Sequence, residues 1–211
     1  MRIAVVGANG RTGRLVVEQA LSRGYGVTAL ARKPHRPSAP DPQLSSVALD
    51  VHDRDRVVGA LRGVDAVIST LGIGTSREPT VTYSEGTRNL LHAMSEQGIK
   101  RIVVVSASPV GPREDQAFFD RRVVMPILDR FFGATYEDMR RMEAVLAASD
   151  ADWTSLRPPR LLEKPPTGRY RLSSSAPLPK ARTLTYADLA AALLDALDRD
   201  DLKRRAAYVA N

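Results

Sequence analysis

The chain contains no cysteine among its 211 residues. Disulfide bonds, thiol nucleophiles and thiolate-bound metals are therefore excluded within it. Its three histidines, His35, His52 and His92, lie far apart in unrelated contexts, so we expect no metal site. Aromatic residues make up only 5% of the chain. No apolar run approaches the roughly 18 residues that a membrane-spanning helix needs, and we expect no membrane partner.

The N-terminus lacks the pattern of an export signal. Met1 and Arg2 lead directly into a short apolar run and then a glycine-rich turn, which we interpret as part of the fold. We therefore predict a cytoplasmic protein.

Positive charge predominates, with 31 basic against 24 acidic residues and a formal net charge of +7. Such a balance favours anionic partners, for example dinucleotide phosphates or nucleic acid. The basic residues are scattered and form no long run, so we consider a nucleic-acid partner unlikely. An arginine-rich genome would also explain the charge.

Short β-branched runs alternate with amphipathic stretches along the whole chain. The expected strands are Arg2–Val6, Gly26–Ala31, Ser46–Leu49, Ala66–Thr70, Arg101–Val105 and Trp153–Leu156. The expected helices are Gly13–Arg23, Asp53–Leu61, Tyr83–Gln97, Tyr136–Ser149 and Tyr186–Asp198, the last with Thr185 and Asp188 as a capping box. This alternation predicts an α/β, single-domain Rossmann fold over residues 1–211. Its sheet would be doubly wound and mostly parallel, with helices on both faces.

A glycine-rich turn follows the first strand at once and opens the first helix. Gly7 permits a tight turn, Gly10 leaves room for a pyrophosphate, and Gly13 allows the helix to pack closely on the strand. The helix N-terminus then offers free N–H groups and a positive dipole to phosphates. An ordinary glycine-rich turn is the alternative, but a preceding strand and a following helix favour dinucleotide binding.

The second strand ends in the basic pair Arg32–Lys33, where NAD-specific sites usually have an acidic residue. A basic end suits a 2′-phosphate, so we predict NADP(H) in preference to NAD(H). Arg11, inside the turn, is predicted to stack on adenine or to contact a phosphate. Further predicted cofactor contacts are Asn9, Thr12, Asp50, Val51, Thr70, Leu71, Gly72, Ser106 and Pro158.

The chain resembles the short-chain dehydrogenase/reductase superfamily in its atypical NAD(P)-binding branch, and especially the biliverdin reductase B/flavin reductase group. The residues that carry the resemblance are Gly7–Gly13, Tyr25–Arg32, Asp65–Ile68, Leu71–Gly72, Ser84–Asn89, Arg141–Met142, Arg157–Pro159 and Thr167–Tyr170. The resemblance implies an NADPH-preferring reductase of flavins, quinones or similar conjugated acceptors. A flavin would then be a substrate rather than a tightly bound group.

Carbonyl reduction in the wider superfamily uses a tyrosine assisted by a lysine. Here Tyr136 has that spacing, but Arg140 stands in the place of the lysine. Arg140 would lower the pKa of the phenol by its charge, making Tyr136 a candidate acid. Alternatively, Tyr136 only begins a helix and Arg140 is an ordinary surface residue.

Two serines follow the fifth strand, at the carboxyl edge where the substrate crevice of such folds lies. In the reductase group the serine proposed to act falls nearest Ala107, so Ser106 or Ser108 would replace it. Alternatively, Ser106 only ends the strand. The group also has histidine where this chain has Arg160; arginine is no general acid, but it can bind a substrate carboxylate. Both differences weaken the case for biliverdin as the substrate.

A substrate-side region is expected over residues 107–135 and 158–185. All four phenylalanines of the chain lie in the first part, and Phe118 and Phe119 are predicted to contact the substrate. They would form an apolar lid over a flat acceptor. A helical pair packed on the core, or a contact between the subunits of a homodimer, fits the spacing equally well, so monomer and dimer both stay open. Pro126 should kink or break any single helix across it.

Two functions follow from these observations. The first is an NADPH-dependent oxidoreductase that reduces a flavin, quinone or related conjugated carbonyl by hydride transfer. The second is a redox sensor similar to NmrA-like proteins, which binds NADP(H) without turnover. A sugar-nucleotide epimerase is a weaker third, since only about 50 residues follow the sixth strand and usual domain sizes leave no room for a substrate domain.

Overall fold

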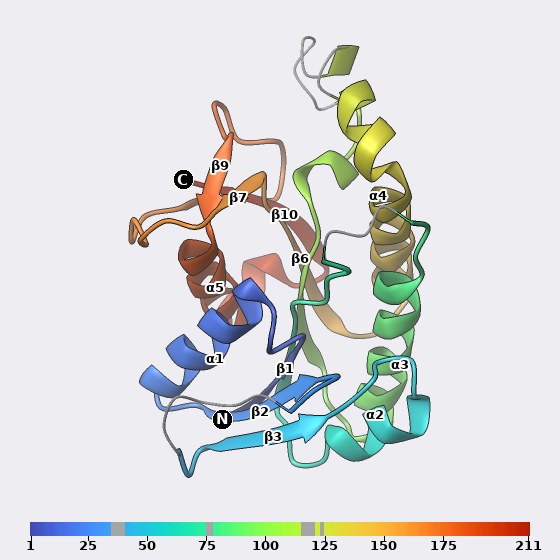
Figure 1. The fold of residues 1–211 in the computed structure, drawn as a ribbon, viewed down its shortest axis with the longest axis vertical. Coiled ribbons are helices and arrows are strands. Elements are labelled where there is room, and N and C mark those ends of the chain that lie inside the picture. Colours follow the sequence, from blue (N-terminus) through green and yellow to red (C-terminus); the bar gives the residue numbers. More distant parts are fainter. Residues whose placement is uncertain (35–40, 75–77, 115–120, 123–124) are drawn as a thin grey trace.

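Eight strands form the central sheet of the computed structural model, in the order β3-β2-β1-β4-β5-β6-β10-β8 (Figure 1). The structure describes residues 1–34, 41–74, 78–114, 121–122 and 125–211. The strands are β1 (Arg2–Val6), β2 (Gly26–Ala31), β3 (Leu44–Ala48), β4 (Ala66–Ser69), β5 (Arg101–Val105), β6 (Asp152–Arg157), β8 (Arg171–Ser173) and β10 (Arg205–Ala210). All neighbours pair in parallel except β8 and β10, which are antiparallel. Two further strands, β7 (Arg160–Leu162) and β9 (Thr183–Thr185), form a separate parallel pair.

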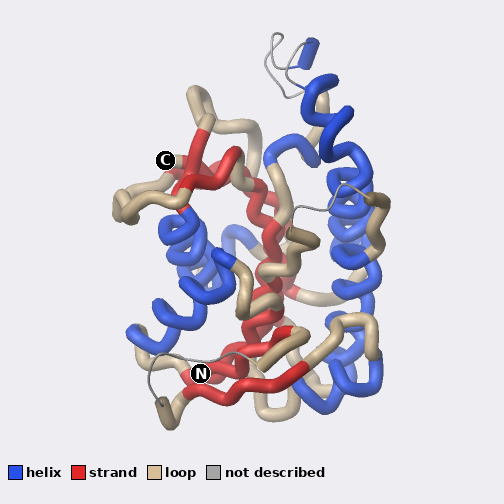
Figure 2. Tube along the Cα trace, in the orientation of Figure 1, coloured by secondary structure: helices blue, strands red, loops and turns tan. Residues whose placement is uncertain are grey.

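Helices cover both faces of the sheet (Figures 1 and 2). One face carries α1 (Arg11–Ser22) and α5 (Tyr186–Asp195). The other carries α2 (Arg54–Ala60), α3 (Thr82–Glu96) and α4 (Met125–Ala147). Short 3₁₀ helices are η1 (Ser108–Val110), η3 (Ala196–Asp198) and η4 (Asp200–Leu202). The predicted doubly wound Rossmann fold is thus confirmed.

The alternating side chains of each strand supply two cores, one on each side of the sheet. In β1, Ile3 and Val5 belong to the core beneath α1 and α5, whereas Ala4 and Val6 belong to the core beneath α2, α3 and α4. All four residues are at most 3% exposed. The continuous apolar run of β1 is therefore the pattern of a strand buried on both faces.

The six strands expected from the sequence are present, with ends that differ by at most two residues. The strands β7, β8, β9 and β10 were not expected. The first three have only three residues each, too few for a period to show. Strand β10 is rich in alanine, which has a low strand propensity, and it gains its place from pairing with β6.

Helix α4 begins at Met125, eleven residues before the start expected at Tyr136. Among the described residues no helix runs across Pro126, because α4 begins only one residue before it, so the expectation that it would kink or break such a helix stays a prediction. Pro126 lies in the first turn, where its missing N–H has no intrahelical acceptor to lose.

Half of the expected capping box forms at the start of α5. The Thr185 hydroxyl accepts the Asp188 N–H at 3.0 Å, as expected. The Thr185 N–H donates instead to Asn211 Oδ1, at 3.1 Å. In a full capping box the Asp188 carboxylate would accept this N–H. That part of the expectation was wrong, because the carboxylate accepts from Thr167 and Gly168 instead.

No helix in the described part of the chain is long and apolar enough to cross a membrane. The described residues also contain no group of three or more acidic or histidine side chains that could hold a metal ion.

Candidate functional site

The turn between β1 and α1 needs glycine at two positions for reasons internal to the backbone. Gly7 has a φ of +80°, and a Cβ there would lie 2.6 Å from the carbonyl oxygen of Thr70. A Cβ on Gly13 would lie 2.2 Å from the Gly7 oxygen and 2.8 Å from Thr70 Oγ1. The chain can therefore bring α1 against the ends of β1 and β4 only if both residues lack a side chain.

Gly10 differs, because its missing side chain leaves open space. Among the described residues, a Cβ there would meet only the Gly7 oxygen within 4 Å, at 3.2 Å. Gly10 is also the N-cap of α1, and no described side chain caps this helix end. The first turn of α1 contains no acidic residue. Free N–H groups, the helix dipole and an open approach together suit the pyrophosphate of a dinucleotide.

Thr70, at the end of β4, braces this turn. Its hydroxyl donates to the Val6 oxygen at 2.9 Å and lies 3.3 Å from the Gly7 oxygen. The residue is only 9% exposed. Thr70 was predicted to lie beneath the cofactor; in the structure its hydroxyl holds the backbone of the turn.

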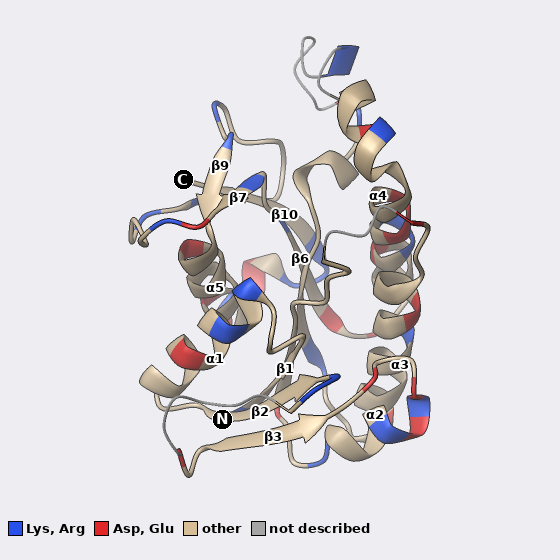
Figure 3. Ribbon diagram, in the orientation of Figure 1, with Lys and Arg blue, Asp and Glu red and all other residues tan. Residues whose placement is uncertain are grey.

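The loop after β2 is tied to the same turn. Asn9 Nδ2 donates to the Lys33 oxygen at 2.9 Å. Arg32 and Lys33 are exposed, and neither forms an ion pair with any described acidic residue. Figure 3 shows the basic end of β2. The tie through Asn9 thus holds two uncompensated positive charges near the glycine turn.

Arg11 points toward α5 in this structure. Its Nη1 donates to the Tyr186 hydroxyl at 3.1 Å, and its guanidinium lies 5.5 Å from the centre of the Tyr186 ring. Thr12 follows it in the first turn of α1. The predicted contacts of both residues with a cofactor stay predictions.

The loops after β3 and β4 meet on α3. A Cβ on Gly86 would lie 2.9 Å from Leu71 Cδ1 and 3.0 Å from Val51 Cγ1, so this glycine lets both loops approach the helix. Asn89 Nδ2 fixes the first loop by donating to the Val51 oxygen at 3.0 Å. Gly72 has open space around it, within the described residues. Asp50, predicted to meet the adenine amino group, is exposed and accepts the His52 N–H at 3.0 Å.

Ser106 directly follows β5, at the carboxyl edge of the sheet, and is a buried polar residue. Its N–H donates to the Leu156 oxygen at 2.8 Å. Its hydroxyl is buried, and it has no hydrogen-bond partner among the described residues. An unsatisfied buried hydroxyl costs stability, so a ligand group that bonds to it is favoured. Ser108 begins η1, and its N–H donates to the oxygen of Pro158 at 2.8 Å.

Tyr136 lies on α4, partly buried against the core beneath that helix. Burial raises the pKa of its phenol, and the charge of Asp129 raises it further. Arg140 lies one turn further along α4, 3.5 Å from Glu137 and donating to the Pro109 oxygen at 3.3 Å. The expectation that Arg140 would lower the pKa of Tyr136 was therefore wrong, because burial dominates and raises it.

A buried charged cluster beside Ser106 was missed by the sequence hypotheses. Arg157 donates from Nη2 and Nε to the two carboxylate oxygens of Glu143, at 2.6 and 3.1 Å. The Ser155 hydroxyl donates to the same carboxylate at 2.8 Å. Burial alone would lower the pKa of Arg157, but its bonds with Glu143 outweigh this and raise it. A sequence signal existed: helical spacing places Glu143 on one face with the residues Met139, Met142 and Leu146, which are all at most 8% exposed.

The predicted substrate contacts are only partly visible. Arg160 is exposed at the start of β7, where it pairs with Thr183. Phe118 and Phe119 lie outside the described residues.

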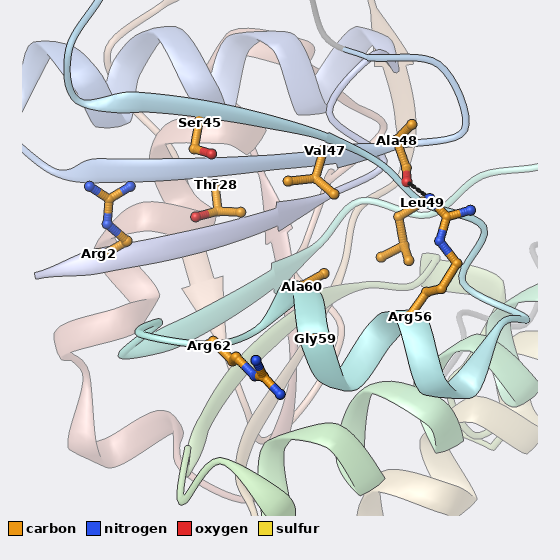
Figure 4. Close-up of a pocket in the computed structure, with 10 residues that line it drawn as sticks. All are labelled: Arg2, Thr28, Ser45, Val47, Ala48, Leu49, Arg56, Gly59, Ala60 and Arg62. Atoms are coloured by element: carbon orange, nitrogen blue, oxygen red, sulfur yellow. Dashed lines mark hydrogen bonds between the residues drawn. The ribbon is translucent and has the colours of Figure 1, made fainter.

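Two hollows in the surface differ in their position relative to the glycine turn. One, of about 620 Å³, opens between α2 and the outer strands β2 and β3 (Figure 4). Its lining residues are Arg2, Thr28, Ser45, Val47, Ala48, Leu49, Arg56, Gly59, Ala60 and Arg62, none of them from the glycine turn. The other, of about 480 Å³, borders the start of α1 and includes Arg11, Arg14 and Tyr186. The second is the one beside the turn.

A family model described as NAD(P)H-binding matches residues 7–200. The chain belongs to this NAD(P)H-binding family. The match begins at Gly7, the first glycine of the turn, and ends at Asp200, shortly before β10. Family membership confirms the NAD(P)H-binding part of the resemblance, and the fold is consistent with an atypical short-chain dehydrogenase/reductase.

Relatives and solved structures extend this result. The chain is 31% identical over 176 residues to an uncharacterized chloroplastic protein of Arabidopsis thaliana, covering 79% of this chain and 61% of that protein. A Veillonella parvula short-chain dehydrogenase/reductase, solved in complex with NADP, superposes with a TM-score of 0.82 at 16% identity over 100% of this chain and 94% of that one. For a candidate NADH-flavin reductase of Streptococcus pneumoniae the TM-score is 0.81 at 20% identity, over 100% and 99%. At these identities the structures show a shared fold.

The chain is shorter than several relatives. It spans 14% of the length of mycobacterial proteins to which it is 37% identical over 120 residues. These long relatives therefore assign no activity to this chain.

Proposed function

We propose that this protein is an NADPH-dependent oxidoreductase that reduces a flavin, a quinone or a related conjugated carbonyl. The cofactor supplies the hydride when bound; the chain's part is to bind and orient both partners. The observation that carries the proposal is the turn at Gly7, Gly10 and Gly13, which leaves the N-terminus of α1 uncapped by any described side chain and open to phosphate.

The preference for NADPH is supported by the basic end of β2. Arg32 and Lys33 are exposed near the turn, where a carboxylate would favour NADH. A guanidinium can bind a 2′-phosphate with two parallel hydrogen bonds.

Arg32→Asp tests this preference. We expect NADPH affinity to fall about 10- to 100-fold, since hydrogen bonds to charged groups contribute about 1.5–3 kcal/mol. NADH affinity should stay the same or rise, because the new carboxylate can accept hydrogen bonds from the ribose hydroxyls. The measurement is a fluorescence titration with each cofactor. Arg62→Asp, at an exposed position after α2, is the matched control and should bind NADPH like the wild type. Equal NADPH affinity in the Arg32 variant would show that the 2′-phosphate lies elsewhere.

The acceptor side is assigned to residues 107–135 and 158–185. Ile127, Phe131 and Phe132 lie in the first half of α4 and are 55%, 42% and 42% exposed. The Phe132 ring lies 6.1 Å from the ring of Tyr136. Exposed apolar and aromatic surface suits a flat conjugated acceptor. Arg160, on β7, would bind an anionic group of the acceptor.

The residues near the crevice suit an acceptor that takes its proton easily. The raised pKa of Tyr136 keeps its phenol protonated but makes it a weak acid at neutral pH. The hydroxyls of Ser106 and Ser108 can orient an acceptor by hydrogen bonds. Reduced flavins and quinones can take protons from water, whereas a simple ketone needs a positioned acid.

An acceptor panel tests the reductase. Purified protein is mixed with NADPH and, in turn, FMN, FAD, quinones and dichlorophenol dyes, and the NADPH absorbance is followed. We expect oxidation that depends on enzyme and saturates with at least one acceptor.

The second candidate function is a sensor that binds NADP(H) without turnover, as in NmrA-like proteins. One observation favours it. Arg140 contacts Glu137 and the Pro109 oxygen, and the pKa of Tyr136 is raised rather than lowered, so Tyr136 is a poor catalytic acid. Tight NADPH binding with no turnover on any acceptor of the panel would overturn the reductase and support the sensor.

A further inference from the structure

Arg157 stands at the end of β6 and links three elements of the fold. Its guanidinium binds the carboxylate of Glu143, on α4, through two nitrogens at 2.6 and 3.1 Å. It also lies 5.4 Å from the centre of the Tyr208 ring, on β10. The side chains of Arg157 and Glu143 are only 14% and 13% exposed. The pair is therefore an internal clamp between sheet and helix.

The backbone on either side of Arg157 holds the loop that carries the candidate serines. The carbonyl of Leu156, the residue before it, accepts the Ser106 N–H at 2.8 Å. The carbonyl of Pro158, the residue after it, accepts the Ser108 N–H at 2.8 Å. Any rotation of the chain at Arg157 would thus move both serines.

The far end of this loop rests on the same clamp. A Cβ on Gly111 would lie 1.9 Å from the Tyr208 hydroxyl oxygen and 3.0 Å from Arg157 Nη1. Gly111 therefore packs directly against the atoms that Arg157 holds. Arg140 adds a bond from α4 to the Pro109 oxygen at 3.3 Å. The loop 106–111 is fixed at its start, middle and end by β6, α4 and β10.

We propose that Glu143 and Arg157 act as a positioning pair that sets the loop 106–111, and with it Ser106 and Ser108, at the carboxyl edge of the sheet. A buried ion pair contributes little net stability compared with apolar side chains of similar volume. Its two-pronged geometry, by contrast, fixes direction. The pair's effect on catalysis rests on the proposed reductase function, whereas its effect on the loop does not.

The double variant Glu143→Leu/Arg157→Met separates positioning from stability. We expect it to fold with a modestly lower melting temperature than the wild type, because apolar residues replace both charges but the buried Ser155 hydroxyl loses its acceptor. Amide hydrogen exchange at Ser106 and Ser108 should become at least about tenfold faster. NADPH affinity should stay unchanged, while turnover falls about tenfold or more without a matching rise in KM.

Arg101→Met is the matched control. Arg101 is also an arginine with little exposure, but it lies at the first residue of β5, at the amino ends of the parallel strands, whereas Arg157 is the last residue of β6. We expect this variant to have a lower free energy of unfolding. Amide hydrogen exchange at Ser106 and Ser108 should speed up no more than it does in the rest of the sheet. Its turnover per folded molecule should match the wild type.

Unchanged exchange at both serine amides in the folded double variant would overturn the proposal. If the double variant does not fold, Arg157→Lys takes its place under the same criterion, since lysine keeps the charge but loses the two-pronged bond. Because exchange requires no substrate, it tests the clamp even if the acceptor panel shows no turnover. If the double variant exchanges faster at the two serine amides but turns over as fast as the wild type, the pair has only a structural role, and the catalytic part of the proposal is overturned.

Discussion

At the scale of single residues, the glycines of the turn serve different purposes. Gly13 is required by the protein itself, because a Cβ would lie 2.2 Å from the Gly7 oxygen. Gly10 is less constrained, because a Cβ there would meet only the Gly7 oxygen among the described atoms, at 3.2 Å, so a small shift would make room for it. The fold thus requires glycine less at Gly10 than at Gly13, which agrees with the proposal that the space at Gly10 admits a phosphate.

Alanine at these two positions separates the two purposes. Gly13→Ala should destabilise the protein by about 1–3 kcal/mol, as overpacking does, and lose NADPH binding as well. Gly10→Ala should cost less, about 1 kcal/mol, because alanine is a poorer N-cap than glycine and its Cβ would press on the Gly7 oxygen. Its methyl group occupies the phosphate's approach, so NADPH affinity should still fall at least about tenfold. Urea denaturation and NADPH titration measure the two effects, and wild-type affinity in Gly10→Ala would contradict the pyrophosphate assignment.

Residue types were easier to predict than residue partners. The need for glycine at Gly7 and Gly13 follows from a strand that turns at once into a helix, which is visible in the sequence. The spacing of Tyr136 and Arg140 is visible too, but the raised pKa of the phenol comes from burial and Asp129. Burial depends on how α4 packs, and no local pattern reports it.

At the scale of elements, Arg101 joins the start of β5 to η3, the short helix that directly follows α5. Its guanidinium donates to the backbone carbonyl oxygens of Leu197 at 3.1 Å and Asp152 at 2.6 Å. It also donates to Thr154 Oγ1 at 2.8 Å. It also donates to the Ala196 oxygen. The last carbonyls of a helix lack part of their intrahelical partners, and here a buried arginine donates to the Leu197 carbonyl and adds a donor to that of Ala196, which also accepts the Arg199 N–H at 3.2 Å.

Arg101→Met should therefore destabilise the protein by about 3 kcal/mol, because buried carbonyls lose their donors. Urea denaturation at neutral pH measures the loss. Arg199→Met is the control, since the Arg199–Asp201 ion pair is exposed and should contribute no more than about 1 kcal/mol. An equal effect of both substitutions would contradict this assignment.

Asp188 performs a comparable task at the start of α5. It is 1% exposed and accepts from the Thr167 N–H at 3.1 Å and from Asn211 Nδ2 at 2.9 Å. Burial alone would raise the pKa of this carboxyl, but the bonds from Thr167 and Asn211 outweigh it and hold the pKa below 3.8. The carboxylate thus fastens the loop after β7 and the C-terminus to α5.

A lowered folded pKa gives a definite pH dependence. The stabilisation from Asp188 is complete above its unfolded pKa, near 3.8, and is lost as the pH falls through the folded value. Asp188→Asn should therefore be less stable than the wild type at pH 7, and the difference should shrink below about pH 4. Urea denaturation across pH 3 to 7 tests this. A difference that does not depend on pH would show that charge is not the source of the stabilisation.

At the scale of the whole molecule, the cofactor should act as a stabilising ligand. The turn connects β1, β4 and α1, and β2 is tied to it through Asn9, so binding there restrains the first half of the sheet. NADPH at 100 times its Kd contributes about 2.7 kcal/mol. For a domain of this size we expect the melting temperature to rise by roughly 5–10 °C.

Thermal melts with NADPH and NADH at equal concentration test this prediction. NADH should shift the melting temperature less, because it lacks the 2′-phosphate that Arg32 and Lys33 would bind. Equal shifts would argue for a cofactor site without preference, and no shift with either would contradict dinucleotide binding.

The sequence by itself determined where the first strands lie along the chain, the glycine turn and the basic end of β2. These features are local: a strand buried on both faces must be continuously apolar, and a tight strand-to-helix turn needs glycine wherever it occurs. The tertiary structure alone decided that β10 lies beside β6, that Thr70 braces the turn and that Glu143 meets Arg157. Each of these joins residues more than ten positions apart, and such pairs form only when the sheet and its helices are packed together. The turn thus predicts what is bound, whereas the packing around Arg157 sets the loop where the chemistry would occur.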